Sequence, residues 1–161
     1  MRSRTAIWFL CKIRYEKTTE DGLQKRVTEQ YVVDALSFTE AESRIMEDMS
    51  SYISGEFEVC EIDRAVFKEI FFSDDDMADK WYKAKLKFIT IDEKTEKEKK
   101  TTVYYLVQAG SFEGARRNID EVMGGTMIDY IIDTVSETSI MDVFEHPSWM
   151  VFEKDNASNG K

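Results

Sequence analysis

In this sequence of 161 residues, few of the side chains that could act in catalysis or bind a metal lie close to one another. His146 is its only histidine and directly precedes Pro147. A catalytic triad needs a base with partners, and a zinc site needs several ligands. The sequence has no second histidine, and such partners are scarce around His146. We therefore interpret His146 as a surface residue and predict no catalytic residue, which favours a protein that is not an enzyme.

The two cysteines, Cys11 and Cys60, are too few for a disulfide framework, so we expect two reduced thiols. Cys11 falls at an alternating position of an apolar run, which predicts a packed thiol rather than a reactive one. No candidate base lies near either cysteine in the sequence. The sequence therefore predicts neither a nucleophile nor a redox pair.

Two further features could hold an ion. The aspartates of 74–76, with Asp79, lack the glycine and glutamate of a calcium loop. We interpret these aspartates as favourable negative charges at the start of a helical turn and as solvated residues of a linker, rather than as metal ligands. Gly124-Gly125 falls at the end of a predicted helix, whereas phosphates bind at helix starts. We predict no metal and no cofactor.

The sequence contains an internal repeat, and this repeat indicates which strands and helices would position a functional site. The run from Trp8 to Tyr15 (WFLCKIRY) aligns with that from Trp81 to Phe88 (WYKAKLKF). Later blocks align in the same order, at an offset of 73 or 74 residues, and the insertions fall in loops. We infer a tandem duplication.

Each repeat predicts two strands, a helix and a third strand. The expected first and second strands are 8–15, 27–35, 81–88 and 101–109, the helices start at 37 and 111, and the third strands are 56–72 and 130–144. Ser37 and Glu40 make a capping box, whereas Gly114 replaces the glutamate in the second helix. We expect that helix to be shorter and less stable. The apolar phase slips near 63–64 and 136–137, which predicts a bulge or a break into two strands.

The predicted fold class is α+β, an internal duplication of a ββαβ unit with mainly antiparallel sheet and helices packed on one face. The first repeat spans 6–72 and the second spans 81–145. An acidic linker, 73–80, joins them and is expected to form one helical turn. A tail, 146–161, follows and is expected to be partly disordered. So short a linker predicts that the halves pack around a pseudo-twofold axis. The strands can form one extended sheet or two packed sheets.

Four polar residues present in both repeats are candidate ligand-site residues: Lys12, Lys85, Glu69 and Asp142. A shared small-molecule or peptide site across the pseudo-twofold axis could use them. Cross-strand pairing on a solvated sheet face is the alternative, because such pairs are duplicated together with the fold. We favour cross-strand pairing.

Composition limits the partners. Hydrophobic residues make up 42% and charged residues 34%, which is enough to bury a core. The net charge is −10, and the 22 basic residues would need sharp segregation to make the cationic face of a nucleic-acid binder. No apolar run approaches the roughly 20 residues that a membrane span needs. We expect a soluble, cytoplasmic protein that binds neither nucleic acid nor membrane.

Three runs carry a family resemblance: residues 8–17 (WFLCKIRYEK), 33–42 (VDALSFTEAE) and 53–57 (ISGEF). They resemble a domain-of-unknown-function family, number four-four-nine-four, found in gut anaerobes of the Bacteroidota. The resemblance covers roughly residues 7 to 145. It implies a bacterial cytoplasmic protein and carries no activity or site residue to transfer.

Two functions remain open. The leading hypothesis is a non-enzymatic binding or interaction module for a protein or peptide, since the chemistry-bearing residues are scattered and a small repeated unit leaves a sheet face or edge open. The alternative is a small-molecule-binding protein or an enzyme with its site at the junction of the repeats, because pseudo-symmetric interfaces make clefts. If one site exists, we expect it where the halves differ. The oligomeric state does not follow from the sequence.

Overall fold

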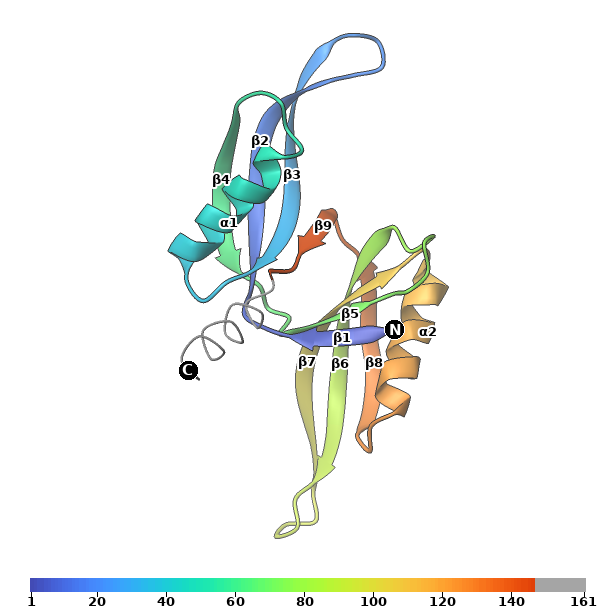
Figure 1. Ribbon diagram of the computed structural model, residues 1–161. Helices are drawn as coiled ribbons and strands as arrows, with labels where there is room; N and C mark the ends of the chain where they lie inside the picture. Colours follow the sequence, from blue (N-terminus) through green and yellow to red (C-terminus); the bar gives the residue numbers. More distant parts are fainter. Residues whose placement is uncertain (147–161) are drawn as a thin grey trace, which may run out of the picture.

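The chain folds into two β-sheets, each covered by one helix, in a computed structural model that describes residues 1–146 (Figure 1). The elements in chain order are β1 (Arg2–Thr5), β2 (Trp8–Thr18), β3 (Gln24–Asp34), α1 (Phe38–Ser50), β4 (Phe57–Arg64), β5 (Glu69–Phe72), β6 (Lys80–Ile91), β7 (Glu98–Ala109), α2 (Phe112–Gly124), β8 (Asp129–Glu137) and β9 (Ile140–Phe144).

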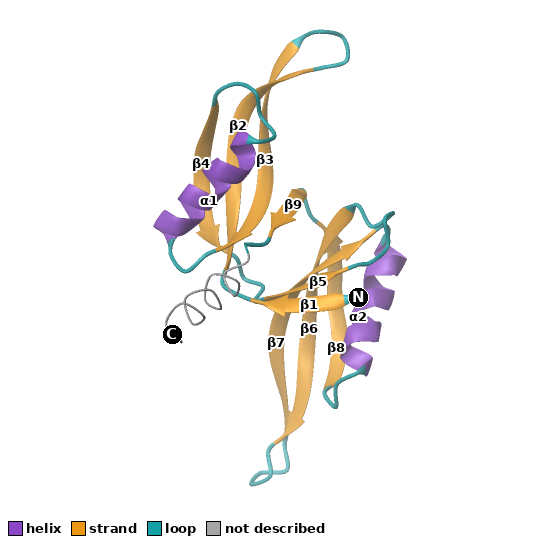
Figure 2. Cartoon of the chain, viewed as in Figure 1, coloured by secondary structure: helices purple, strands orange, loops and turns teal. Residues whose placement is uncertain are grey.

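The first sheet has the order β4-β2-β3-β9 and the second the order β1-β5-β7-β6-β8. Within each sheet the long strands pair antiparallel. Helix α1 lies on one face of the first sheet and α2 on one face of the second (Figure 2). The predicted α+β class, with helices on one face of each sheet, is confirmed, and the strands form two sheets rather than one.

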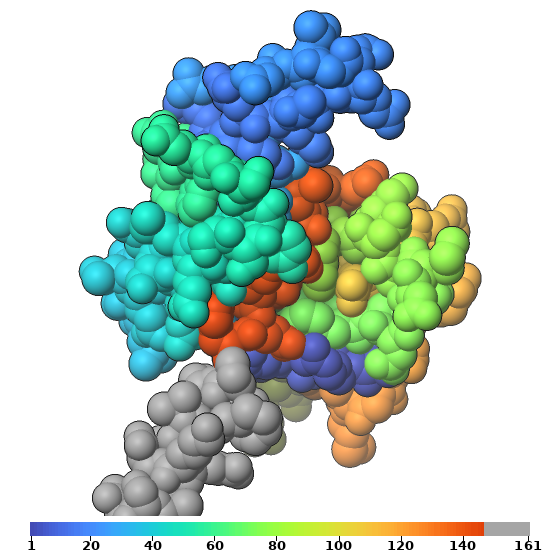
Figure 3. Space-filling model, turned by 45° about the horizontal axis from the view of Figure 1, so that its top comes forward, coloured from blue at the N-terminus to red at the C-terminus, as the bar shows by residue number. Residues whose placement is uncertain are grey.

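The two halves exchange their last strands. β5 pairs in parallel with β7, and β9 pairs in parallel with β3. The two registers are equivalent, because Glu69 lies opposite Tyr105 and Asp142 lies opposite Tyr31. In Figure 3, the red-orange segment that includes β9 lies between the two halves. Each sheet therefore takes strands from both sequence repeats. The matching registers are those that a duplication would produce, although duplication itself stays a prediction.

The expected disruption of each third strand is confirmed in both halves. The first breaks between Arg64 and Glu69, and the second between Glu137 and Ile140. Each also contains a bulge, because the register against β2 shifts at Cys60 and the register against β6 shifts at the equivalent strand position, Asp133. The break frees β5 and β9 to cross to the other sheet.

The central core lies between the two sheets. Its buried members are Trp8, Val32, Phe67, Ile70, Phe72, Trp81, Leu106, Ile140 and Val143. The tryptophan that starts each repeat is almost fully buried here, with Trp8 1% and Trp81 3% exposed. Two further cores lie under α1 and α2. The tryptophan shared by the repeats therefore serves packing between the sheets.

Both helices have 13 residues, so the expectation that the second is shorter is wrong. Ser111 Oγ accepts a hydrogen bond from the Gly114 amide as Ser37 Oγ does from that of Glu40. The Glu40 carboxylate also accepts from the Leu36 amide at 3.0 Å, a bond that Gly114 cannot make. In the described residues no helix is long and apolar enough to cross a membrane.

Two segments differ from the sequence prediction. β1 was not expected, because its residues, RSRT, have no apolar alternation; it pairs with β5 through its backbone. The linker forms turns instead of a helical turn, since the Asp75 carboxylate accepts a hydrogen bond from the Met77 amide at 2.9 Å. The predicted tail falls, from 147 onward, outside the described residues.

The central core makes a stability prediction. Ile70→Ala removes a fully buried side chain and is expected to lower the free energy of unfolding by about 3 kcal/mol. The control, Ile131→Ala, changes a side chain that is 43% exposed and should cost less than about 0.5 kcal/mol. Urea denaturation followed by circular dichroism measures both. Equal losses in the two variants would contradict a core between the sheets.

Candidate functional site

The two candidate lysines lie on the uncovered faces of different sheets. Lys12 Nζ is 2.9 Å from Glu61 Oε2, and Lys85 Nζ is 3.5 Å from Asp133 Oδ2. Both acids come from the neighbouring edge strand, β4 or β8. The lysines therefore take part in the cross-strand pairing that was the alternative explanation for them.

The two candidate acids lie beside tyrosines of the core under each helix. Glu69 is opposite Tyr105, and Asp142 is opposite Tyr31. Burial raises the pKa of Asp142, and the Val143 amide, which donates to its carboxylate at 2.8 Å, opposes that rise. The structure thus brings each acid to a tyrosine, and it does not bring the acids to the lysines.

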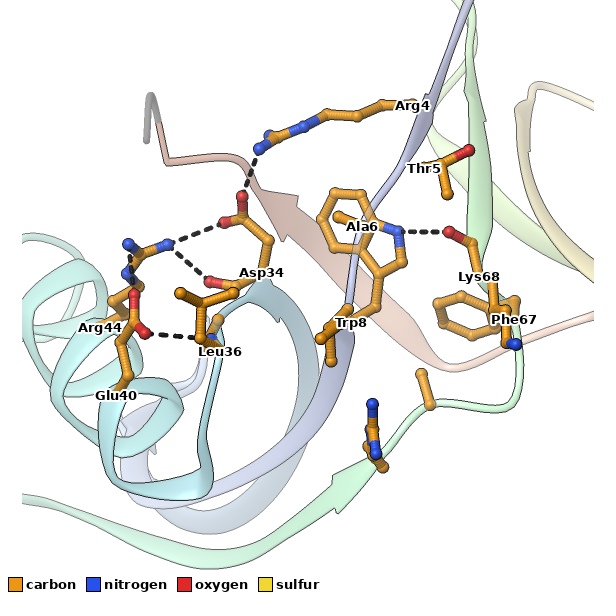
Figure 4. A pocket seen from close by; sticks show the side chains of 14 residues that line it. Arg4, Thr5, Ala6, Trp8, Asp34, Leu36, Glu40, Arg44, Phe67 and Lys68 are labelled. Atoms are coloured by element: carbon orange, nitrogen blue, oxygen red, sulfur yellow. Dashed lines mark hydrogen bonds and ion pairs between the residues drawn. The ribbon is translucent and has the colours of Figure 1, made fainter. Parts of the chain in front are cut away.

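A cavity of about 780 Å³ lies elsewhere, at one end of the junction (Figure 4). Three connections meet there: the one from β1 to β2, the one from β3 to α1, and the one from β4 to β5. The lining residues are Arg4, Thr5, Ala6, Ile7, Trp8, Asp34, Ala35, Leu36, Glu40, Arg44, Arg64, Ala65, Phe67 and Lys68. None of the four sequence candidates is among them.

One wall of the cavity is apolar, and cations lie beside it. Trp8 Nε1 donates to the backbone carbonyl of Lys68 at 3.2 Å, which fixes the indole (Figure 4). Leu36 is 82% exposed at the rim. Within residues 1–146, the ion pairs around the cavity use Arg4 and Arg44 and leave out Arg64 and Lys68. Two cations are therefore available to an anion.

A buried carboxylate also lines the cavity. Asp34 is 4% exposed, the only charged side chain of the described residues that is so well buried. Its Oδ2 pairs with Arg4, and its Oδ1 lies 3.3 Å from Arg44 Nη1 (Figure 4). The same Arg44 nitrogen donates to the Asp34 backbone carbonyl at 2.7 Å. Two arginines thus hold β1 and α1 against the end of β3.

His146 belongs to this charged network, so the expectation of a surface residue is wrong. Its side chain is 19% exposed and lies between two carboxylates, with Nδ1 2.8 Å from Asp34 Oδ1 and Nε2 3.0 Å from Asp48 Oδ2. Only the doubly protonated imidazolium donates to both. Burial raises the pKa of Asp48, and the contact with His146 opposes the rise. Sequence proximity could not reveal this pairing, because 112 residues separate Asp34 from His146.

The second half builds the equivalent network from neutral groups. Gln108 stands where the repeat alignment places Asp34, and Asn118 stands where it places Arg44. Gln108 Oε1 accepts from the Ser73 amide at 3.0 Å, as Asp34 Oδ1 accepts from the His146 amide at 3.0 Å. Asn118 Nδ2 donates to the Gln108 carbonyl at 2.9 Å. The same backbone arrangement therefore forms without charge.

The second half also closes the space that is a cavity in the first. The repeat alignment places Gly110 at the position of Leu36, and a side chain at Gly110 would come within 2.7 Å of the Met77 carbonyl. The linker packs directly on that glycine. Glu137 and Met141 stand at the positions of Arg64 and Lys68. The cavity and its free cations are features of the first half, and the difference between Leu36 and Gly110 is the sequence signal that could have indicated them.

The acidic run of the linker makes local contacts instead of an ion site. The Asp74 carboxylate pairs with the amino group of Met1, and Asp75 closes a turn. Among residues 1–146, no three His, Cys, Asp or Glu side chains gather as metal ligands would.

The charged network gives a prediction on Asp34. Asp34→Asn removes the shared partner of two arginines and a histidine, and is expected to lower the free energy of unfolding at pH 7 by about 3 kcal/mol. Asp133→Asn, whose side chain is 34% exposed, is the control and should change it by less than about 0.5 kcal/mol. Chemical denaturation measures both. A loss at Asp34 no larger than the control would show that the network is not coupled to folding.

The thiols differ in accessibility. Cys11 is buried, and burial raises its pKa to about 12, whereas Cys60 is exposed on the bulge of β4. We expect Cys60 alone to react with iodoacetamide in the folded protein at pH 8, and Cys11 only after unfolding in urea, because the thiolate is the nucleophile. Mass spectrometry of the labelled peptides checks this. Early labelling of Cys11 would contradict its place in the core.

Comparisons with known proteins add a family and nothing on activity. No curated protein and no solved structure is detectably similar to this chain. One family profile matches residues 7–146, which include every described element except β1. That match confirms the resemblance seen in the sequence, and the chain belongs to the family described as "Domain of unknown function (DUF4494)".

Proposed function

We propose that this chain is a non-enzymatic binding protein for a small organic anion, and that the ligand binds in the cavity at the junction of the halves. The observation that supports this most directly is the pair Arg64 and Lys68. Both line the cavity beside its apolar wall, and neither takes part in the ion pairs around it within residues 1–146. Both side chains are exposed, so each is free to form a charge-assisted hydrogen bond to an anionic group of a ligand.

The size of the cavity favours a small ligand over a protein partner. Its volume of about 780 Å³ falls in the range of about 300–1,000 Å³ that small-molecule sites occupy. Ile7, Leu36 and Phe67 offer an apolar surface to the body of the ligand. Arg64 and Lys68 would then receive a carboxylate or phosphate group. This moves our preference from the protein or peptide partner to the small-molecule alternative.

The side chains around the cavity support binding rather than catalysis. Among the lining residues within 1–146, Thr5 supplies the hydroxyl, and none is a histidine or cysteine. The imidazole of His146 is engaged on both nitrogens by Asp34 and Asp48. A nucleophile needs an adjacent base to become active; the residue opposite Thr5 in the sheet is Glu69, which is not part of the lining.

The cellular setting is part of this proposal. Two free thiols are typical of a reducing compartment. The acidic composition suits a soluble protein, and the bacterial cytoplasm is the setting that the family resemblance of the sequence implies. We therefore place the ligand among the anionic metabolites of a bacterial cytoplasm.

Thermal unfolding in the presence of a metabolite library tests the proposal. A ligand that binds only the folded chain raises the melting temperature in proportion to the logarithm of its concentration. We expect hits among compounds with an apolar body and a carboxylate or phosphate, and a loss of the shift in the variant Arg64→Gln with Lys68→Gln. Losing two charge-assisted contacts should weaken binding roughly 100-fold.

The matched control is Lys12→Gln with Lys94→Gln, which removes two cations that lie outside the cavity. That control must keep the full shift. Hits that bind the cavity variant as tightly as the natural chain would contradict a site at Arg64 and Lys68. A screen in which neutral compounds bind better than anions would contradict the ligand class.

A further inference from the structure

The second sheet has a basic face that is independent of the cavity. On β6, three consecutive residues of the face that α2 leaves uncovered are lysines: Lys83, Lys85 and Lys87. The intervening residues of β6 point into the core under α2. Lys83 Nζ lies 5.1 Å from the centre of the Tyr104 ring on β7. Three cations therefore follow one strand on one side of the sheet.

The first sheet has the same geometry with a different charge pattern. Along β4, acids lie opposite β2: Asp63 opposite Leu10, Glu61 opposite Lys12, and Glu58 opposite Arg14. Along β8, the residues opposite the lysines are neutral: Ser136 opposite Lys83, Thr134 opposite Lys85, and Ile131 opposite Lys87. At these directly opposite positions, the second sheet thus has no acid where the first has three, and its central strand has one more cation.

Among the described residues, the ion pairs of Lys85 and Lys87 both go to Asp133 of the bulge, and Asp129 lies further along the same face, opposite Ile89. Asp133 Oδ2 is 3.5 Å from Lys85 Nζ and 3.8 Å from Lys87 Nζ, so one carboxylate is shared by two cations. All three side chains are about one third exposed. Like charges at alternate positions of one strand repel each other unless an anion is added. Because the whole chain has a net charge of −10, this local excess of positive charge means that the lysines are concentrated on one face.

We infer that this face binds an acidic, extended segment of a partner protein. Residues i and i+2 of an extended chain lie on one face and are separated by roughly 6.6–6.8 Å. Lysines at alternate positions of β6 have that repeat, and so do acids at alternate positions of an extended partner. The hydroxyls of Thr134 and Ser136 adjoin the lysines and can donate to further carboxylates.

An acidic protein segment fits this face better than single-stranded nucleic acid. Nucleic acid without sequence preference binds through several aromatic side chains on which successive bases stack. Among residues 1–146, the aromatic side chain that this face offers beside the lysines is Tyr104, and that ring already lies beneath Lys83. The net charge of −10 also repels a densely charged polyanion at long range more than it repels a short acidic peptide.

Fluorescence anisotropy with a labelled 12-residue peptide of alternating glutamate and threonine tests this inference. We expect the full chain to bind it in low salt, and binding to weaken as salt is raised. The variant Lys83→Gln, Lys85→Gln, Lys87→Gln should lose roughly tenfold in affinity, a sum of three partly exposed ion pairs. Thr134→Glu with Ser136→Asp places the acids of the first sheet beside the lysines and should cause a similar loss.

Two control variants separate this site from others. Lys12→Gln, Arg14→Gln, Arg26→Gln removes cations from the matching region of the first sheet, and Arg64→Gln, Lys68→Gln removes those of the cavity; both should keep full affinity. Circular dichroism confirms that every variant is folded. Unchanged binding in the β6 variant would overturn the inference. Tighter binding of a 12-residue oligothymidine than of the peptide would also overturn it, in favour of nucleic acid.

Discussion

The parallel pairing of β5 with β7 and of β9 with β3 is the interaction on which the rest of the structure depends. Each sheet would have only three long strands without the strand that arrives from the other half. The arriving strands bring Ile70 and Val143 into the core between the sheets. To cross over, the chain must pass through the junction after Arg64, and that passage forms one wall of the cavity.

The repeat alignment predicted the order of the elements and the break in each third strand, because both depend on local patterns. It could not predict the exchange. A last strand that pairs within its own half buries the same alternating side chains as one that pairs with the other half, so the pattern of Ile70 and Phe71 is identical in both cases. β1 was missed for a related reason. Its stability comes from backbone pairing with β5 and from contacts of Arg4, neither of which a four-residue polar run displays.

The candidate site illustrates a second limit of repeats. Residues that are common to both halves occupy equivalent places in two different sheets. Lys12 and Lys85, which were chosen because they are common to both halves, therefore lie apart. The features that distinguish the site are positions where the halves differ. Leu36 against Gly110 and Arg64 against Glu137 are visible in the alignment, and their meaning depends on which connections meet at the junction.

The charged network around Asp34 follows from this comparison. In the second half, Gln108 and Asn118 make the same backbone contacts without charge, so folding alone does not require ions at this place. Burying ions costs desolvation energy, and a neutral network is often as stable. The long charged side chains of Arg4 and Arg44 do connect separate elements, because they join β1 and α1 to the carboxylate of Asp34. Both arginines also line the cavity. Because Asp34 pairs with these two arginines, Arg64 and Lys68 are the lining cations that make no ion pair within residues 1–146, and our proposal rests on them.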